Sequence, residues 1–250
     1  MSVGRSAAPV DGSVRWLLGS MALWELIQLL REVGPEVGSS WPVGLFDLLL
    51  LTVVPALTAF AFIRLFLAVV QSNYGSLNTY TLTSSPWAWM FWLGLGTALL
   101  GQGVHATAGL LQTQMPDVVA NGEFGDLVRF MHEDLGHWLL GGGFFLMSVL
   151  IIFLGMGSSY RVFGGERTFL ALGSLITYGA VVLFLGVEGG LLVPAIIGSG
   201  LLAAVAFWVL PARDLFHDPV GLLVVPGTAV GGLALLIWGL LVGGQPTSPW

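Results

Sequence analysis

Three of the four histidines in this chain lie close together in the sequence. His105 is in the outer part of one apolar stretch, and His132 and His137 lie where the next one begins. Ionisable side chains inside a membrane are costly, so they usually have partners and a task. Imidazoles beside carboxylates can bind a metal ion or transfer protons. The sequence therefore predicts a polar site between membrane helices.

The two histidine-bearing stretches each place polar residues on one face. Gln102, His105 and Gln112 are spaced i, i+3, i+10, which on a helix falls within one narrow stripe. Glu133 and His137 are one turn apart, so they can touch each other or share an ion.

His132 is harder to place on that face. On a regular helix it points about 140° away from His137, so both join one site only if the helix starts irregularly near Gly136. The five-residue separation also differs from the four-residue spacing of the His-Glu-x-x-His zinc motif.

Two carboxylates come from the helices that precede the histidines. Glu25 and Gln28 share a stripe near the end of the first predicted helix, and Asp47 lies one turn into the second. At about 1.5 Å per residue, we expect Glu25, Asp47 and His105 roughly 6–12 Å below the outer membrane surface, with His137 near that surface.

The favoured interpretation is a divalent metal site, zinc in preference to iron, because imidazole and carboxylate suffice as ligands. The expected ligands are His105, Glu133, His137 and His132. Glu25 and Asp47 are the candidate catalytic bases for a metal-bound water. Gln102, Gln112 and Gln28 would support the ligands by hydrogen bonds. This chemistry predicts a metal-dependent membrane enzyme, a hydrolase of a lipid-like substrate.

Three alternatives stay open. His105 and His137 on adjacent helices could hold haem b in an electron-transfer subunit. The acidic and imidazole groups could form the relay of a proton or cation transporter. They could also be polar packing contacts in a structural membrane subunit, because interhelical hydrogen bonds stabilise membrane bundles.

The composition defines the elements that must position these residues. Of the 250 residues, 56% are hydrophobic and 9% are charged, whereas a soluble domain carries about 25% charged residues. We predict an all-α, polytopic integral membrane protein of the cell membrane, with one transmembrane domain over 1–250 and a bundle of seven transmembrane helices. The predicted helices are 14–32, 43–70, 87–113, 126–156, 168–188, 191–210 and 219–243.

The arginines predict the orientation. Arg5, Arg15, Arg161, Arg167 and Arg213 would gather on one side, and Arg31 and Arg129 on the other. Because positive residues favour the cytoplasmic side, the N-terminus should be cytoplasmic and the C-terminus outside.

Composition also excludes several classes of function. The chain has no cysteine, which rules out thiolate chemistry. All eight basic residues are arginine, so no lysine can form a retinal Schiff base. A net charge of −6 argues against nucleic acid as a partner. The expected partners are membrane lipids, and glycine-rich helices would suit a homo-oligomer or a subunit of a membrane complex.

Seven helices with histidines and acids resemble, in architecture, the superfamily of membrane hydrolases that contains the alkaline ceramidases and adiponectin receptors. The resemblance implies a metal-dependent hydrolase. The late-helix His-x-x-x-His of that superfamily is absent here, because the predicted sixth and seventh helices contain no histidine. The likeness covers no continuous motif, and we infer no membership from it.

Overall fold

The computed structural model describes residues 8–30, 36–37, 43–74, 80–120, 122–155, 161–210 and 215–244. Within these ranges the chain is helical apart from short connections and one two-residue antiparallel ladder, in which β1 (Glu36–Val37) pairs with β2 (Val43–Gly44). The helices are α1 (Ala8–Leu30), α2 (Leu45–Leu51), α3 (Val53–Tyr74), the π-helix η2 (Tyr80–Ser84), α4 (Pro86–Gln114), α5 (Pro116–Val119), α6 (Gly122–Arg129), the π-helix η3 (Phe130–Leu135), α7 (Gly136–Gly155), α8 (Gly164–Val187), α9 (Leu192–Val209) and α10 (Pro219–Val242).

Five helical runs within the described residues are long and apolar enough to cross a bilayer. They are Leu45–Ser72, Gly122–Gly155, Gly164–Val187, Leu192–Val209 and Pro219–Val242. The remaining long helices, α1 and α4, are not among these five. The five apolar runs indicate a multi-pass membrane protein of the all-helical class.

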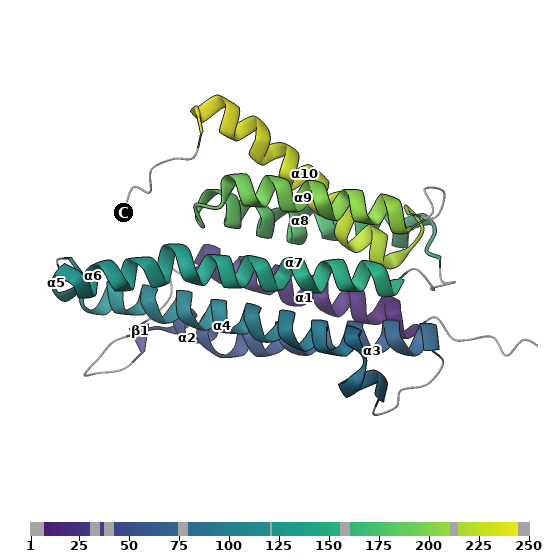
Figure 1. Ribbon diagram of the computed structural model, residues 1–250, viewed down its shortest axis with the longest axis horizontal. Coiled ribbons are helices and arrows are strands. Elements are labelled where there is room, and N and C mark those ends of the chain that lie inside the picture. The colour runs from purple at the N-terminus through teal and green to yellow at the C-terminus, as the bar shows by residue number, and fades with distance from the viewer. Residues whose placement is uncertain are drawn as a thin grey trace, which may run out of the picture.

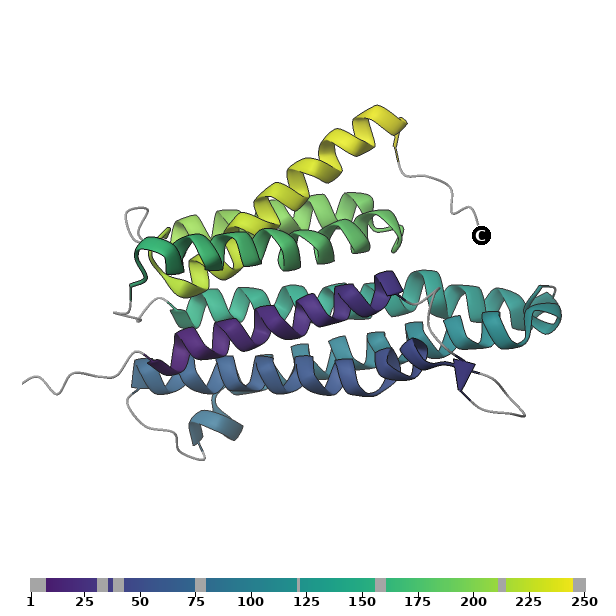
Figure 2. The ribbon, with the colours of Figure 1, turned by 180° about the vertical axis from the view of Figure 1, so that it is seen from behind.

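The long helices run side by side as a bundle. Helices α8, α9 and α10 lie together on one side of α1 and α7, and α3 and α4 lie on the other side (Figure 1). The view from behind shows α1 between α3 and α8 (Figure 2). The pair formed by α4 and α7 extends past the other helices at one end, where α5 and α6 connect them (Figure 1). His105 lies on α4, His137 on α7, and His132 on η3, which leads directly into α7.

Ion pairs mark the opposite end of the bundle. Arg15, near the start of α1, pairs with Glu166 at the start of α8. Arg161, just before α8, lies 3.7 Å from Asp218 at the start of α10. Three helix starts therefore meet at one end. Of the other arginines used to predict orientation, Arg5, Arg31 and Arg213 lie outside the described residues.

The helix predicted at 43–70 is two helices, and Pro55 accounts for the break. A proline ring clashes with the carbonyl four residues earlier and offers no N–H to bond it. That carbonyl belongs to Leu51, where α2 ends. The Thr52 side chain and main-chain N–H both bond to the Leu48 carbonyl and close the end of α2. Asp47 lies in the first turn of α2.

Glycines let α4 and α7 approach closely. A Cβ atom on Gly136 of α7 would lie 2.8 Å from the Cβ of His105 on α4. A Cβ on Gly101 of α4 would lie 2.8 Å from the Gly136 carbonyl oxygen. Small residues at a membrane helix interface allow such backbone contact. The histidine site therefore forms where two helices nearly touch.

Asp218 caps α10, and we expect Asp218→Ala to lower the free energy of unfolding by about 1–2 kcal/mol. Its carboxylate is buried and accepts hydrogen bonds from the main-chain N–H groups of Val220 and Gly221, at 2.9 and 3.0 Å. Detergent-based unfolding measures the effect. The matched control is Asp126→Ala. Among the described residues, Asp126 is exposed and contacts Arg129 at 3.7 Å, an interaction worth little. Equal losses in both variants would contradict the capping role.

Candidate functional site

The side chains of His105, His132 and His137 form one group, here called the histidine cluster. The rings of His105 and His132 are stacked, with centroids 4.2 Å apart and planes 14° apart. The His137 ring centroid lies 4.4 Å from that of His105 and 6.1 Å from that of His132. The three rings therefore lie together in one group.

Main-chain carbonyls of η3 orient two of the three rings. The Nδ1 atom of His105 is 3.1 Å from the His132 carbonyl oxygen, and Nδ1 of His137 is 2.7 Å from the Glu133 carbonyl oxygen. A carbonyl oxygen can only accept, so each Nδ1 must carry the proton. In the neutral ring, Nε2 then carries the lone pair. The Nε2 atom of His137 is buried and has no hydrogen-bond partner within the described chain.

The π-helix explains how His132 joins the group. A π-helix closes its hydrogen bonds over five residues, instead of four, so its turns are wider. Its last residue, Leu135, directly precedes Gly136, where regular α-helix begins. This is the irregular start that a shared site for His132 and His137 required. Single π-turns within α-helices are frequent at functional sites.

A small polar pocket adjoins the cluster, and its free volume of about 20 Å³ can hold one water or ion. Its walls come from α1, α2, α4 and η3: Gln28, Asp47, Leu50, Gln102, His105, Ala106, Gly109 and His132. The Gln102 amide donates to the Leu50 carbonyl at 3.5 Å, which ties α4 to the end of α2. The structure thus brings Asp47, Gln28 and Gln102 to the histidines, as their stripes suggested.

Three predicted site residues are placed differently. Glu133 meets His137 through its main-chain carbonyl, and no described contact joins the two side chains. Gln112 lies two turns beyond His105 and does not line the polar pocket. Glu25 does not line it either: its Oε1 atom is buried without a hydrogen-bond partner in the described chain, close enough to Glu188 for electrostatic repulsion. Helix α1 packs along α8, whose C-terminal cap is Glu188.

Two aromatic residues that no sequence pattern had singled out lie next to the site. The ring of Phe184 lies edge-on to those of His105 and His137, with centroid distances of 6.2 and 5.6 Å. Trp24 packs edge-on against Phe184 at 5.3 Å. Neither residue belongs to a polar stripe, and aromatic residues are common in apolar helices. Only the tertiary arrangement distinguishes them.

The candidate metal-ligating side chains are not arranged around a common metal position in this structure. Among the described residues, no three His, Asp or Glu side chains are placed to hold a metal ion between them. The stacking of His105 on His132 is one reason, because a metal binds in the plane of each imidazole ring and parallel rings direct their lone pairs side by side.

Comparisons with protein-family models, with curated proteins and with solved structures found no match to this chain. The class of protein therefore rests on the five apolar helices, which indicate a multi-pass helical membrane protein.

Proposed function

We propose that this protein binds a divalent metal ion, zinc in preference to iron, at the histidine cluster and uses it to hydrolyse a lipid-like ester or amide. The observation that carries the proposal is the pair of Nδ1–H bonds to η3 carbonyls. Metal-binding histidines usually donate their other ring N–H to a carbonyl or carboxylate, which fixes the tautomer and aims the ligating nitrogen.

The buried Nε2 atom of His137 supports the same conclusion. An acceptor that is buried without a partner costs about 1–3 kcal/mol. His137 as a whole residue is only 2% exposed, so bulk water does not reach its ring freely. A metal ion bound to Nε2 would remove that cost. A purely structural histidine at this position would gain nothing from leaving the nitrogen unpaired.

His105 and His137 are the first ligands in this proposal. A third comes from His132 or Asp47, both in contact with the polar pocket beside His105. His132 has to rotate out of its stack with His105 to aim a nitrogen at the same ion. It is half-buried at a π-helical turn, where its side chain has more room than the rings packed between α4 and α7.

A fourth, open position would hold a water whose pKa zinc lowers to about 7. Asp47 is the better placed of the two candidate bases, because it lines the polar pocket and Glu25 does not. Asp47 would take the proton from the water as the water oxygen attacks the substrate carbonyl. It would then return that proton to the alcohol or amine that leaves as the ester or amide bond breaks.

The arrangement favours this reading over haem and transport. Haem needs the two imidazoles on opposite faces of a porphyrin. The ring centroids of His105 and His137 are only 4.4 Å apart, between closely packed helices, which leaves no space for a porphyrin between them. A proton path needs polar groups across the bilayer. Inward of Gln102 the next cavity is lined almost wholly by apolar side chains.

The proposal includes seven spanning helices with a cytoplasmic N-terminus. Helix α1 packs along α3 and α8, and α4 packs along α7, so both lie among helices that are apolar enough to span. Helix α4 has 29 residues, a length of about 44 Å, which exceeds the roughly 30 Å of hydrocarbon. Arg15 and Arg161 at the opposite end from the histidines favour that end as cytoplasmic.

Elemental analysis of the purified protein tests the proposal. We expect about one zinc per chain after purification with zinc present and removal of loosely bound ions. Hydrolysis of p-nitrophenyl palmitate should stop when a strong chelator removes the ion and resume when zinc is returned. An absorption spectrum of the same sample should have no Soret band. A metal-free protein after zinc loading would refute the proposal, and a Soret band would select haem instead.

A further inference from the structure

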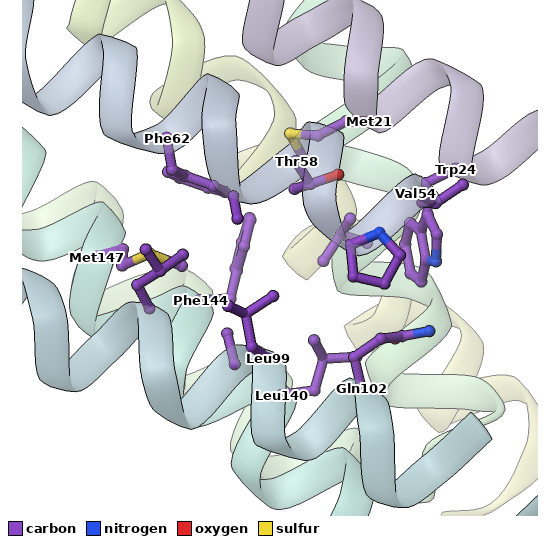
Figure 3. A pocket seen from close by; sticks show the side chains of 15 residues that line it. Met21, Trp24, Val54, Thr58, Phe62, Leu99, Gln102, Leu140, Phe144 and Met147 are labelled. Atoms are coloured by element: carbon purple, nitrogen blue, oxygen red, sulfur yellow. The ribbon is translucent and has the colours of Figure 1, made fainter. Parts of the chain in front are cut away.

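An apolar cavity lies directly inward of the polar pocket. Its free volume is about 80 Å³, and it is lined by residues of α1, α3, α4, α7 and α8. Its walls include Met21, Trp24, Ala59, Phe62, Gln102 and Met147. Figure 3 shows Phe62 and Met147 at one end and Trp24 and Gln102 at the other.

Gln102 connects this cavity to the candidate site. It lines both the apolar cavity and the polar pocket, and it lies one turn from His105 on the same face of α4. Trp24, at the same end, packs on Phe184, whose ring edge meets His105 and His137. The polar and apolar spaces thus lie end to end.

The cavity walls select hydrocarbon as the occupant. A water molecule needs two to four polar partners, and a cavity lined by apolar groups stays dry. Inside a bilayer, lipid alkyl chains surround the protein and can fill such a space. Leu99 on the wall is 38% exposed at the outer surface of the bundle. Thr58 and Ala59 of α3 also line the cavity and are half-buried, so the cavity reaches the surface of the bundle at α3 and α4 beside Leu99.

The dimensions restrict the occupant to one chain. The lining residues of α3 run from Val54 to Phe62, a length of about 12 Å. The small free volume suits one unbranched chain. Met21 and Met147 are flexible side chains that can adapt around a chain.

We propose that this apolar cavity holds a single hydrocarbon chain of the substrate, which enters from the bilayer between α3 and α4 and places its ester or amide group beside Gln102 and the histidine cluster. The role as a substrate chain rests on the proposed function. Occupation by an alkyl chain does not, because it follows from the cavity alone.

Photolabelling tests the occupancy. The protein in lipid nanodiscs is incubated with palmitic acid that carries a diazirine midway along its chain, irradiated, and mapped by mass spectrometry. We expect labels on Phe62 and Met147, which are each 2% exposed and out of reach of surrounding lipid. Labels confined to outward residues such as Phe60, which is 50% exposed, would overturn the proposal.

Two variants of α3 provide the matched comparison. Ala59→Phe places a ring in the cavity and should reduce labelling of Phe62 and Met147 about tenfold or more. Ala56→Phe adds the same ring at an exposed position outside the cavity and should leave labelling unchanged. Equal labelling in both variants would overturn the proposal.

Metal content separates the two proposals. A zinc-free protein that is still labelled at Phe62 would refute the metal site and support the chain cavity. A zinc-loaded protein without that label would refute the cavity and leave the metal site standing.

Discussion

His137→Ala is expected to abolish zinc retention. The variant removes the imidazole whose Nε2 atom is buried without a partner and whose Nδ1–H is held by the Glu133 carbonyl. Loss of a supporting hydrogen bond around a metal usually weakens binding 10–100-fold, so loss of a ligand should weaken it by more than about 100-fold. Zinc titration of the purified variant against a competing chelator measures the change.

His217→Ala is the matched control for this experiment. The Nδ1 atom of His217 also faces a main-chain carbonyl, that of Val162, at 3.2 Å, but His217 lies at the opposite end of the bundle. Its removal should leave zinc binding unchanged. If both variants keep zinc equally, the histidine cluster is not the metal site.

Alanine also leaves a space between α4 and α7, and that space alone could disturb the fold. His137→Gln keeps most of the volume and a polar end, yet it lacks the imidazole nitrogen. We expect His137→Gln to unfold like the zinc-free wild type in a thermal scan and to bind no zinc. A folded His137→Gln protein with wild-type zinc affinity would show that the ring nitrogen plays no part in binding.

The sequence predicted the components of this site because each follows a local rule. Long apolar runs mark the helices, and the 3.6-residue period placed Gln102 and His105 on one stripe. The same reasoning showed that His132 and His137 could meet only through an irregular turn. It could not show that η3 supplies this turn, because a π-helix depends on how α7 packs against α4.

The remaining differences come from packing between elements. Pro55 was visible in the sequence, but whether a proline bends or breaks a membrane helix depends on its neighbours. Glu25 lies on a polar stripe, yet it does not line the polar pocket, because that depends on how α1 packs against its neighbours. Phe184 adjoins two histidines only because α8 passes beside α7. None of these contacts between helices can be predicted from a local sequence pattern.

The close contact between α4 and α7 gives a second strong prediction, that Gly136→Ala destabilises the protein and weakens metal binding. Gly136 has ordinary right-handed helical angles, φ −59° and ψ −48°, so alanine has no backbone strain there. In an open helical position, Gly→Ala stabilises by up to about 1 kcal/mol. The new methyl group would instead lie 2.8 Å from the His105 Cβ and 3.0 Å from its main-chain nitrogen.

Helix α4 must therefore move away from α7, and His105 moves with it. We expect Gly136→Ala to lower the free energy of unfolding in mixed detergent by about 1–3 kcal/mol, the usual cost of overpacking. Zinc affinity should fall about tenfold or more, because the ring of His105 shifts relative to that of His137.

Gly142→Ala is the control on the same helix, since a Cβ there meets nothing within 4 Å. It should be neutral or slightly stabilising and leave zinc affinity unchanged. The opposite signs of these two Gly→Ala changes separate steric contact at the histidine cluster from a general sensitivity of α7 to substitution. A Gly136→Ala protein as stable as Gly142→Ala would mean that α4 and α7 do not meet at His105.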